Sequence, residues 1–228
     1  MDLHFSDAIY ANLQRADPSL WALERSVVVL PVLFLTEKAV NTAACRETEA
    51  CVLMSDRVSP SSFEELRRCV KTRSCSLDKN RLGSHRYIDR KWLKGGAKPL
   101  PLRCLKFEGM EPYVILRRAP DTPLFDPLFY DYGGNKQTFV ESLRYYSDQW
   151  FVLNNVFAID SRHPKSAYRQ QFDETYRHRA ALNSFLIQLR SHELRHSQKE
   201  KMPICSRFFS LVFIKHKDDK HMLQYRFR

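Results

Sequence analysis

Two short apolar runs with a helical pattern between them restrict the fold of this chain more than any other feature. Tyr113 to Leu116 is one run, and Phe151 to Ile159, broken at Asn154, is the other. Short apolar runs bounded by Pro, Gly or Asn are typical of buried strands. From Lys136 to Tyr146 the spacing is helical instead, with one apolar face formed by Phe139, Val140, Leu143 and Tyr146. Together with Val27 to Leu30, the pattern predicts an α/β domain whose strands form one sheet covered by this helix.

A glycine pair, Gly133-Gly134, stands directly before the predicted helix. Glycine has no Cβ, so backbone at such a position can approach a ligand closely. Asn135 and Lys136 follow and would add polar side chains at the helix start. The pair therefore indicates a ligand-binding loop, with a simple turn as the alternative.

Composition and charge leave several classes of partner open. The chain has 228 residues and 43% hydrophobic content, enough for one sizeable globular domain. A net charge of +11 suits nucleic acid, an anionic membrane surface, or acidic sugars and nucleotide phosphates equally well. No helix-turn-helix, RNA-binding or zinc-finger signature is present, so nucleic acid is not the favoured partner.

The sequence contains no candidate membrane span. Its longest apolar run, Ser26 to Leu35, is interrupted by Pro31 and is far shorter than the roughly 20 residues that a bilayer requires. The first residues lack a basic stretch followed by an apolar core, so they do not read as a secretory signal.

Six cysteines bear on the compartment in which the protein works. Cys45 and Cys51 are separated by five residues, as are Cys69 and Cys75, and both pairs lie in polar segments of the sequence. This spacing fits small disulfide loops or a bridge between the two segments, and it fits a zinc site poorly. Free thiols in a reducing compartment are the alternative. Cys104 and Cys205 are interpreted as core residues.

From Glu111 to His163 the chain carries a series of blocks in a fixed order. The blocks are Glu111 to Arg118 (EPYVILRR), Phe125 to Phe129 (FDPLF), Tyr132 to Lys136 (YGGNK), Phe151 to Leu153 and Ile159 to His163 (IDSRH). This text resembles the acceptor-side half of LARGE-like glucuronyltransferases, glycosyltransferase family 49.

The resemblance implies a fold and a division of the chain. The fold would be a partial GT-A-like glycosyltransferase domain, a mixed sheet flanked by helices, over residues 1–200. The donor-binding half would precede the first residue. Residues 201–228 would form a basic C-terminal extension. A Golgi enzyme of this family also has a membrane anchor upstream, which this chain does not contain.

In the resemblance, Asp2 and His4 stand where the family has an Asp-x-Asp on a strand, followed by a short helix. His4 replaces the second carboxylate, and Mn²⁺ accepts imidazole as well as carboxylate. The divalent ion would neutralise the leaving charge of a nucleotide-sugar diphosphate. Two polar residues at a frayed chain end are the alternative.

Asp160 and His163 are the other implied metal ligands. The family has Ile-His-x-Pro-His at this place, whereas here the first His is Asp160, the Pro is Arg162, and His163 is retained. A carboxylate is a competent ligand for a hard cation. We therefore expect Asp2, His4 and either Asp160 or His163 to converge on Mn²⁺.

Inverting transfer needs a carboxylate that takes the proton of the acceptor hydroxyl. Glu111, at the mouth of a strand, and Asp126, in the turn before the glycine loop, match family positions and are the candidate bases. The alternative for each is an ordinary turn or strand-end carboxylate, and it applies above all to Asp126, which precedes Pro127.

Substrate contacts are expected from Arg117, Gly133, Gly134, Asn135 and Lys136. By strand alternation Arg117 and Arg118 would point to opposite faces, so that one guanidinium reaches an acidic sugar or phosphate and the other packs on a helix. Gly134 replaces a family Trp on which a sugar ring would stack.

The remaining segments predict further elements. Pro60 to Lys71 begins with a capping signature and reads as a helix, as does Gln170 to Gln198. Phe208 to Ile214 has strand character.

The favoured function is transfer of glucuronic acid from a UDP donor to a glycan hydroxyl with inversion, in the Golgi lumen. The alternative is an inactive relative that binds glycans or proteins, because the Asp-x-Asp, the Trp and the first His are altered. A basic nucleic-acid binder is a third class.

Overall fold

The computed structural model describes residues 3–7, 9–15, 25–45, 47–77, 85, 87–96, 98–129, 133–164 and 167–205. Asp2, Tyr132 and the predicted strand Phe208 to Ile214 lie outside the described residues.

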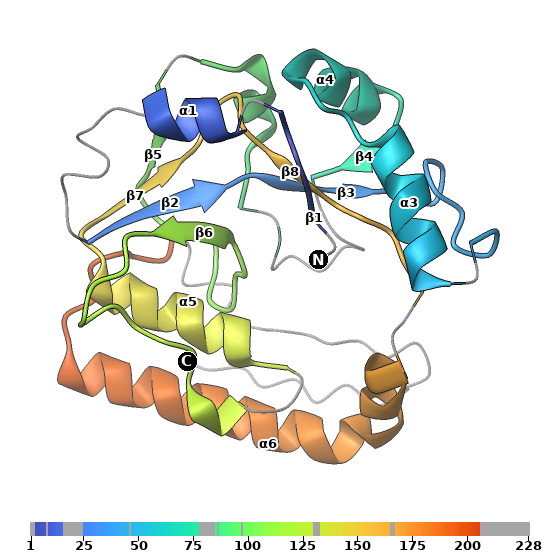
Figure 1. Ribbon diagram of the computed structural model, residues 1–228. Coiled ribbons are helices and arrows are strands. Elements are labelled where there is room, and N and C mark those ends of the chain that lie inside the picture. The colour runs from blue at the N-terminus through green and yellow to red at the C-terminus, as the bar shows by residue number, and fades with distance from the viewer. Residues whose placement is uncertain are drawn as a thin grey trace.

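A long central strand, interrupted by a proline, organises the fold (Figure 1). It consists of β2 (Ser26–Leu30) and β3 (Val32–Leu35), and every residue of both is buried. Pro31 has no N–H and separates the two, while its carbonyl accepts a 2.8 Å hydrogen bond from the Ala158 N–H. Strand β7 (Gln149–Val152) pairs with β2, and β8 (Ala158–Asp160) pairs with β3, both in parallel.

Antiparallel strands complete two mixed sheets. The first has the order β5-β7-β2-β6, with β5 at Leu100–Leu102 and β6 at Tyr113–Leu116. The second has the order β1-β8-β3-β4, with β1 at Leu3–Phe5 and β4 at Cys75–Ser76. The predicted α/β class, with mixed sheets flanked by helices, is confirmed at this level.

One part of the predicted sheet is wrong. The run from Phe151 to Ile159 does not lie in a single sheet, because β7 pairs in the first and β8 in the second. Asn155 adopts a left-handed backbone with φ 57° and turns the chain between them. The Asn154 and Asn155 side chains donate to the carbonyls of Lys98 and Gly96 and hold that turn against the preceding loop.

Alternation along the central strand divides the interior into two cores. Val27, Val29, Leu33 and Leu35 face the larger core, which contains Cys51 of α3 (Thr48–Val58), Leu66 of α4 (Phe63–Lys71) and Leu143 of α5 (Asn135–Tyr146). Val28, Leu30, Val32 and Phe34 face the smaller core, covered in part by Leu3 and by Ile9 and Leu13 of α1 (Ile9–Arg15).

The predicted helices form close to their expected positions. Helix α4 begins with the expected capping box, in which Ser62 accepts from the Glu65 N–H and Glu65 accepts from the Ser62 N–H. Hydrogen bonds from the Ser61 and Ser62 backbone lower the pKa of Glu65. The long helix α6 (Ala167–Ser197) lies beside α5 (Figure 1). Within the described residues, no helix is both long and apolar enough to cross a membrane.

All six cysteines are paired. Cys45–Cys51 and Cys69–Cys75 close short loops, which was one of the two disulfide arrangements that the spacing allowed. The interpretation of Cys104 and Cys205 as core residues is wrong, because they form a third disulfide across 101 residues. The segment of Cys205 lies against the segment of Cys104, with the Cys205 N–H donating to the Leu105 carbonyl at 2.7 Å.

A buried arginine fixes the start of the C-terminal extension. Arg144 of α5 is 2% exposed, and its guanidinium binds Glu141 at 2.6 Å, Glu200, and the Met202 carbonyl at 3.0 Å. Its own carbonyl accepts from the N–H groups of Lys201 and Met202. Burial raises the pKa of Glu141 in spite of this partner. Residues 201–205 therefore pack on the domain rather than extend away from it.

The long-range disulfide should contribute more to stability than a short one. In the chain-entropy view, a bridge across roughly 100 residues contributes about 4.7 kcal/mol, and one across a loop of 15 residues or fewer about 3 kcal/mol or less. We expect Cys104→Ser/Cys205→Ser to lower the free energy of unfolding in urea by more than Cys69→Ser/Cys75→Ser does. Equal losses in the two double variants would contradict the assignment.

Candidate functional site

Glu111 is held by the first turn of α5. Its Oε1 accepts a 3.0 Å hydrogen bond from the Gln137 amide, and its side chain is 21% exposed. Glu111 precedes β6 and Gln137 follows the glycine pair, so two of the sequence blocks meet at this point. The carboxylate is thus oriented, and it is only partly withdrawn from solvent.

His85 approaches the same carboxylate from the other side. Its Nε2 lies 3.9 Å from Glu111 Oε2, and its side chain is 10% exposed. The His85 ring packs edge-on against Phe34 of β3 with ring centroids 5.2 Å apart. Phe34 and Asp160 are parallel strand partners, so their side chains share one face of the second sheet.

Lys136, in the same first turn of α5, contacts an aromatic ring of β6. This exposed residue lies one position before Gln137, and its Nζ is 5.0 Å from the centre of the Tyr113 ring. We call the four residues that the contacts of Glu111 and His85 link the Glu111 cluster: Phe34, His85, Glu111 and Gln137. Of the residues predicted from sequence, Glu111 lies in this cluster, and Asp160 shares a strand face with Phe34.

Tyr87 supports the cluster from inside. Its hydroxyl donates to the Leu30 carbonyl at 3.3 Å, at the end of β2. Burial raises the pKa of Tyr87 well above its usual range, and the charges of Tyr113 and Asp160 add to that effect. The side chain therefore stays neutral and holds the junction between the two sheets.

Asp126 makes contacts of its own. Its Oδ1 accepts from the Leu128 N–H at 2.9 Å, at the start of η3 (Pro127–Phe129), and its Oδ2 lies 4.0 Å from Arg190 of α6. The hydrogen bond from the Leu128 N–H has the character of the turn role that was the alternative for this residue, and the Arg190 contact connects the turn to α6.

The glycine pair turns the chain into α5. Gly133 and Gly134 have φ of 100° and 80°, and Gly134 is the N-cap residue whose carbonyl accepts from the Thr138 N–H. A Cβ on Gly134 would lie 2.7 Å from the Phe129 ring. The close approach that glycine permits here is therefore to Phe129, in addition to any ligand.

His4 and Asp160 lie on adjacent strands and on opposite faces. In the β1–β8 pair His4 is opposite Ile159 and Leu3 is opposite Asp160, and side chains alternate along a strand. His4 Nδ1 lies 3.6 Å from Asp56 of α3. The expected strand and short helix are present, but this register separates the two side chains.

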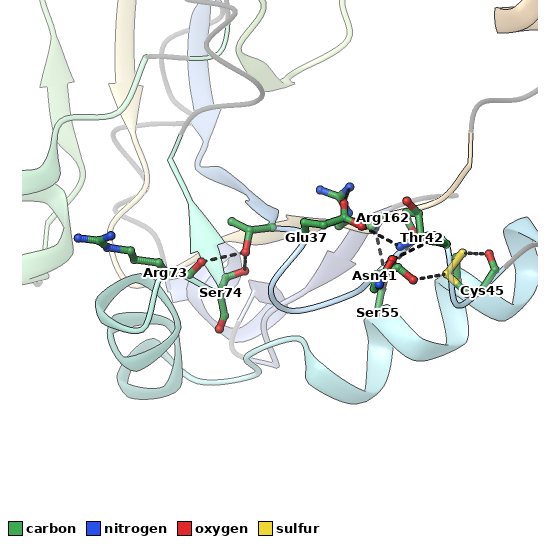
Figure 2. Close-up of polar contacts among 11 residues, drawn as sticks. Glu37, Asn41, Thr42, Cys45, Ser55, Arg73, Ser74 and Arg162 are labelled. Carbon is green, nitrogen blue, oxygen red and sulfur yellow. Dashed lines mark hydrogen bonds and ion pairs between the residues drawn. A yellow bond between two sulfur atoms is a disulfide. The ribbon is translucent and has the colours of Figure 1, made fainter.

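The segment after β8 is attached to α3 and to the loop after β3 (Figure 2). The Arg162 N–H donates to Ser55 Oγ at 3.1 Å, and the Arg162 guanidinium forms an ion pair with Glu37. His163 Nδ1 lies 2.7 Å from the Pro164 carbonyl. Arg162 thus fixes the strand end.

These positions bear on the expected Mn²⁺. Among the described residues, no group of three His, Cys, Asp or Glu side chains is arranged to hold a metal ion. Asp2 lies outside them. Because His4 and Asp160 are on opposite strand faces, these two side chains do not share an ion, and the set of Asp2, His4 and His163 stays a prediction. We derive no step through the metal.

Arg117 and Arg118 follow β6 and are both exposed. The expectation that one of them packs on a helix is wrong, since the strand ends at Leu116 and the alternation ends with it. Arg117 remains accessible to an acidic ligand.

An apolar cavity of about 450 Å³ lies between η2 (Arg90–Lys94) and β5, beside the Cys104–Cys205 bridge. Trp92, Leu105, Met110 and Val152 form much of its wall, and none of the residues predicted for the site lines it.

Three members of the cluster, Phe34, Gln137 and His85, are not among the site residues predicted from sequence, and His85 is the titratable one. It stands in the basic, polar interval from Thr72 to Leu100, which has no periodicity that would place it. Only the tertiary contact with Phe34 and Glu111 distinguishes it.

No protein-family model matches the sequence, and no curated protein shows significant similarity to it.

Tyr87→Phe should change how the stability of the protein depends on pH. Loss of its hydrogen bond should cost about 1 kcal/mol at neutral pH. Above about pH 10 unfolded Tyr87 ionises while the buried residue keeps its proton, so the wild-type protein loses stability as pH rises. Urea unfolding should therefore show the difference between wild type and variant shrinking from pH 8 to 11. A constant difference would contradict burial of the hydroxyl.

Gly134→Ala should destabilise the fold. The left-handed backbone costs about 1–2 kcal/mol with a Cβ, and the contact with Phe129 adds to this. Gly96→Ala is the matched control, because Gly96 lacks positive φ and its new Cβ would meet only the Asn154 side chain, at 3.0 Å. Thermal unfolding should show the larger loss for Gly134→Ala, and equal losses would count against this turn geometry.

Proposed function

We propose that the chain is a glycosyltransferase, related to the LARGE-like family, that transfers glucuronic acid from a UDP donor to a glycan hydroxyl with inversion. The observation that carries the proposal is the convergence of Glu111 with the first turn of α5. Glu111, in one block of the resemblance, accepts a hydrogen bond from Gln137, which lies 26 residues further along the chain and directly follows another block.

Glu111 would be the catalytic base. As the acceptor hydroxyl oxygen attacks the anomeric carbon, Glu111 takes the hydroxyl proton, and the sugar–phosphate bond breaks with its electron pair leaving on UDP. Gln137 fixes one carboxylate oxygen, and His85 lies 3.9 Å from the other. The base thus has a defined orientation before substrate arrives.

Two cations could meet the acidic parts of the substrates. Lys136 is exposed in the helix turn that also carries Gln137, with its Nζ over the Tyr113 ring. Arg117 is exposed after β6 and has the planar guanidinium that suits a carboxylate or phosphate.

The disulfides support a site of action in the secretory pathway. Three bridges involve every cysteine of the chain, and disulfides persist mainly in oxidising compartments. The Golgi lumen, which the resemblance implies, is such a compartment.

A non-catalytic glycan-binding relative is the second candidate. The specific observation in its favour is that His4 lies 3.6 Å from Asp56 and on the opposite strand face from Asp160. In this alternative the Glu111 cluster would bind a saccharide without turnover.

The test is UDP release from UDP-glucuronic acid with a panel of glycan acceptors, with and without Mn²⁺. We expect Glu111→Gln to reduce kcat by about 10²–10⁴-fold, the range for loss of general-base catalysis. Glu64→Gln on α4 is the matched control, because Glu64 is 83% exposed. Its turnover should equal that of the wild type.

Acceptor binding separates the two candidates. Glycan binding without UDP release under any condition would favour the non-catalytic relative. Turnover unaffected by Glu111→Gln would exclude Glu111 as the base, and the absence of both binding and turnover would contradict the proposed function.

A further inference from the structure

The exposed side of α6 carries two histidines one helical turn apart. His192 and His196 are both exposed, and their ring centroids are 4.2 Å apart with the planes at 47°. Residues at i and i+4 lie above one another on a helix, so the spacing itself brings the rings together. The Glu111 cluster uses neither residue.

We propose that His192 and His196 form a binding site for a transition-metal dication of the Zn²⁺, Cu²⁺ or Ni²⁺ class. Neutral imidazole is a preferred ligand of these ions, with Zn–N bonds of about 2.0–2.1 Å. Two rings on adjacent turns can direct one nitrogen each at a common point. Water completes the coordination, because both rings face solvent.

The charged side chains next to the two histidines are paired with other residues. Glu193, between the two histidines in sequence, lies 3.3 Å from Arg190. Arg195 lies 3.7 Å from Glu108, before β6. Leu194 is buried and anchors this part of the helix to the body.

The segment His192-Glu193-Leu194-Arg195-His196 also matches the His-Glu-x-x-His pattern of zinc hydrolases. Such enzymes need a third ligand and a Glu that activates water. In the part of the chain that the structure describes, no third His, Cys, Asp or Glu joins the pair, and Glu193 is engaged by Arg190. The inference is therefore restricted to metal binding.

Competing thiolate ligands are absent from the oxidised protein. All six cysteines are in disulfides, so a measurement on the full chain with its bridges intact reports on other ligands. The site is also separate from the predicted Mn²⁺ ligands His4, Asp160 and His163, which lie on and after the second sheet.

The experiment is a Zn²⁺ titration of the full, untagged chain against a chromophoric chelator. Loss of even an outer-shell partner costs roughly 10–100-fold in metal affinity, so His192→Ala and His196→Ala should each weaken Zn²⁺ binding by at least about tenfold. Alanine is the best helix former, so both variants should keep α6, which circular dichroism can verify.

Two controls distinguish the pair from other sites. Glu193→Gln and His163→Ala should bind Zn²⁺ as the wild type does. Cu²⁺ bound to the wild type should show nitrogen coupling from two imidazoles in electron paramagnetic resonance, and Cu²⁺ bound to either His→Ala variant should not. The proposal is overturned if the wild type does not bind Zn²⁺, if either His→Ala variant binds it within about twofold of wild type, or if His163→Ala loses binding equally.

Discussion

The parallel pairing of residues 26–35 with residues 149–160 is the constraint on which the other elements depend. Both segments are interrupted, one at Pro31 and the other at Asn154-Asn155, and the interruptions lie side by side. Each segment thereby contributes one strand to each sheet. The helices can bury their apolar faces only because this shared strand pair supplies two cores, one on each side of it.

The interruption also explains where the polar residues gather. Regular strands direct all of their backbone groups into ladders, but at Pro31 one donor is missing and the neighbouring carbonyls are satisfied from elsewhere. The Leu30 carbonyl accepts its hydrogen bond from the Tyr87 hydroxyl. His85 lies two residues before Tyr87 in the chain, and residues that line the apolar cavity follow it. A break in a buried strand thus brings the polar interval before β5 against the loop that carries Glu111.

Local patterns explain which parts could be predicted from sequence. The helices at Pro60 to Lys71 and Gln170 to Gln198 and the strands at Val27 and Tyr113 follow from periodicity and capping, which are properties of adjacent residues. The division of β7 from β8 between the two sheets depends on which strands each of them pairs with, and the Cys104–Cys205 bridge depends on where residues 201–205 pack. No local signal carries either fact.

The candidate site shows the same limit. Glu111 and Lys136 could be predicted as site residues because they lie in sequence blocks with a recognisable order. His85 is identified only by its tertiary contact with Phe34. For His4 and Asp160 the strand positions could be anticipated, but the relative register of β1 and β8 decides on which face each side chain lies. A shift of one residue in that register would place His4 and Asp160 on the same face of the sheet.

The Cys104–Cys205 bridge makes residues 104–205 a covalent ring that contains β6, α5, both late strands and α6, while the central strand lies outside it. A protease that cuts the exposed stretch near Leu124 would open the ring without releasing a fragment. The nicked protein would keep its mass under non-reducing conditions and separate into two pieces only after reduction. In an oxidising compartment the domain would therefore survive a single cleavage in its longest covalent loop.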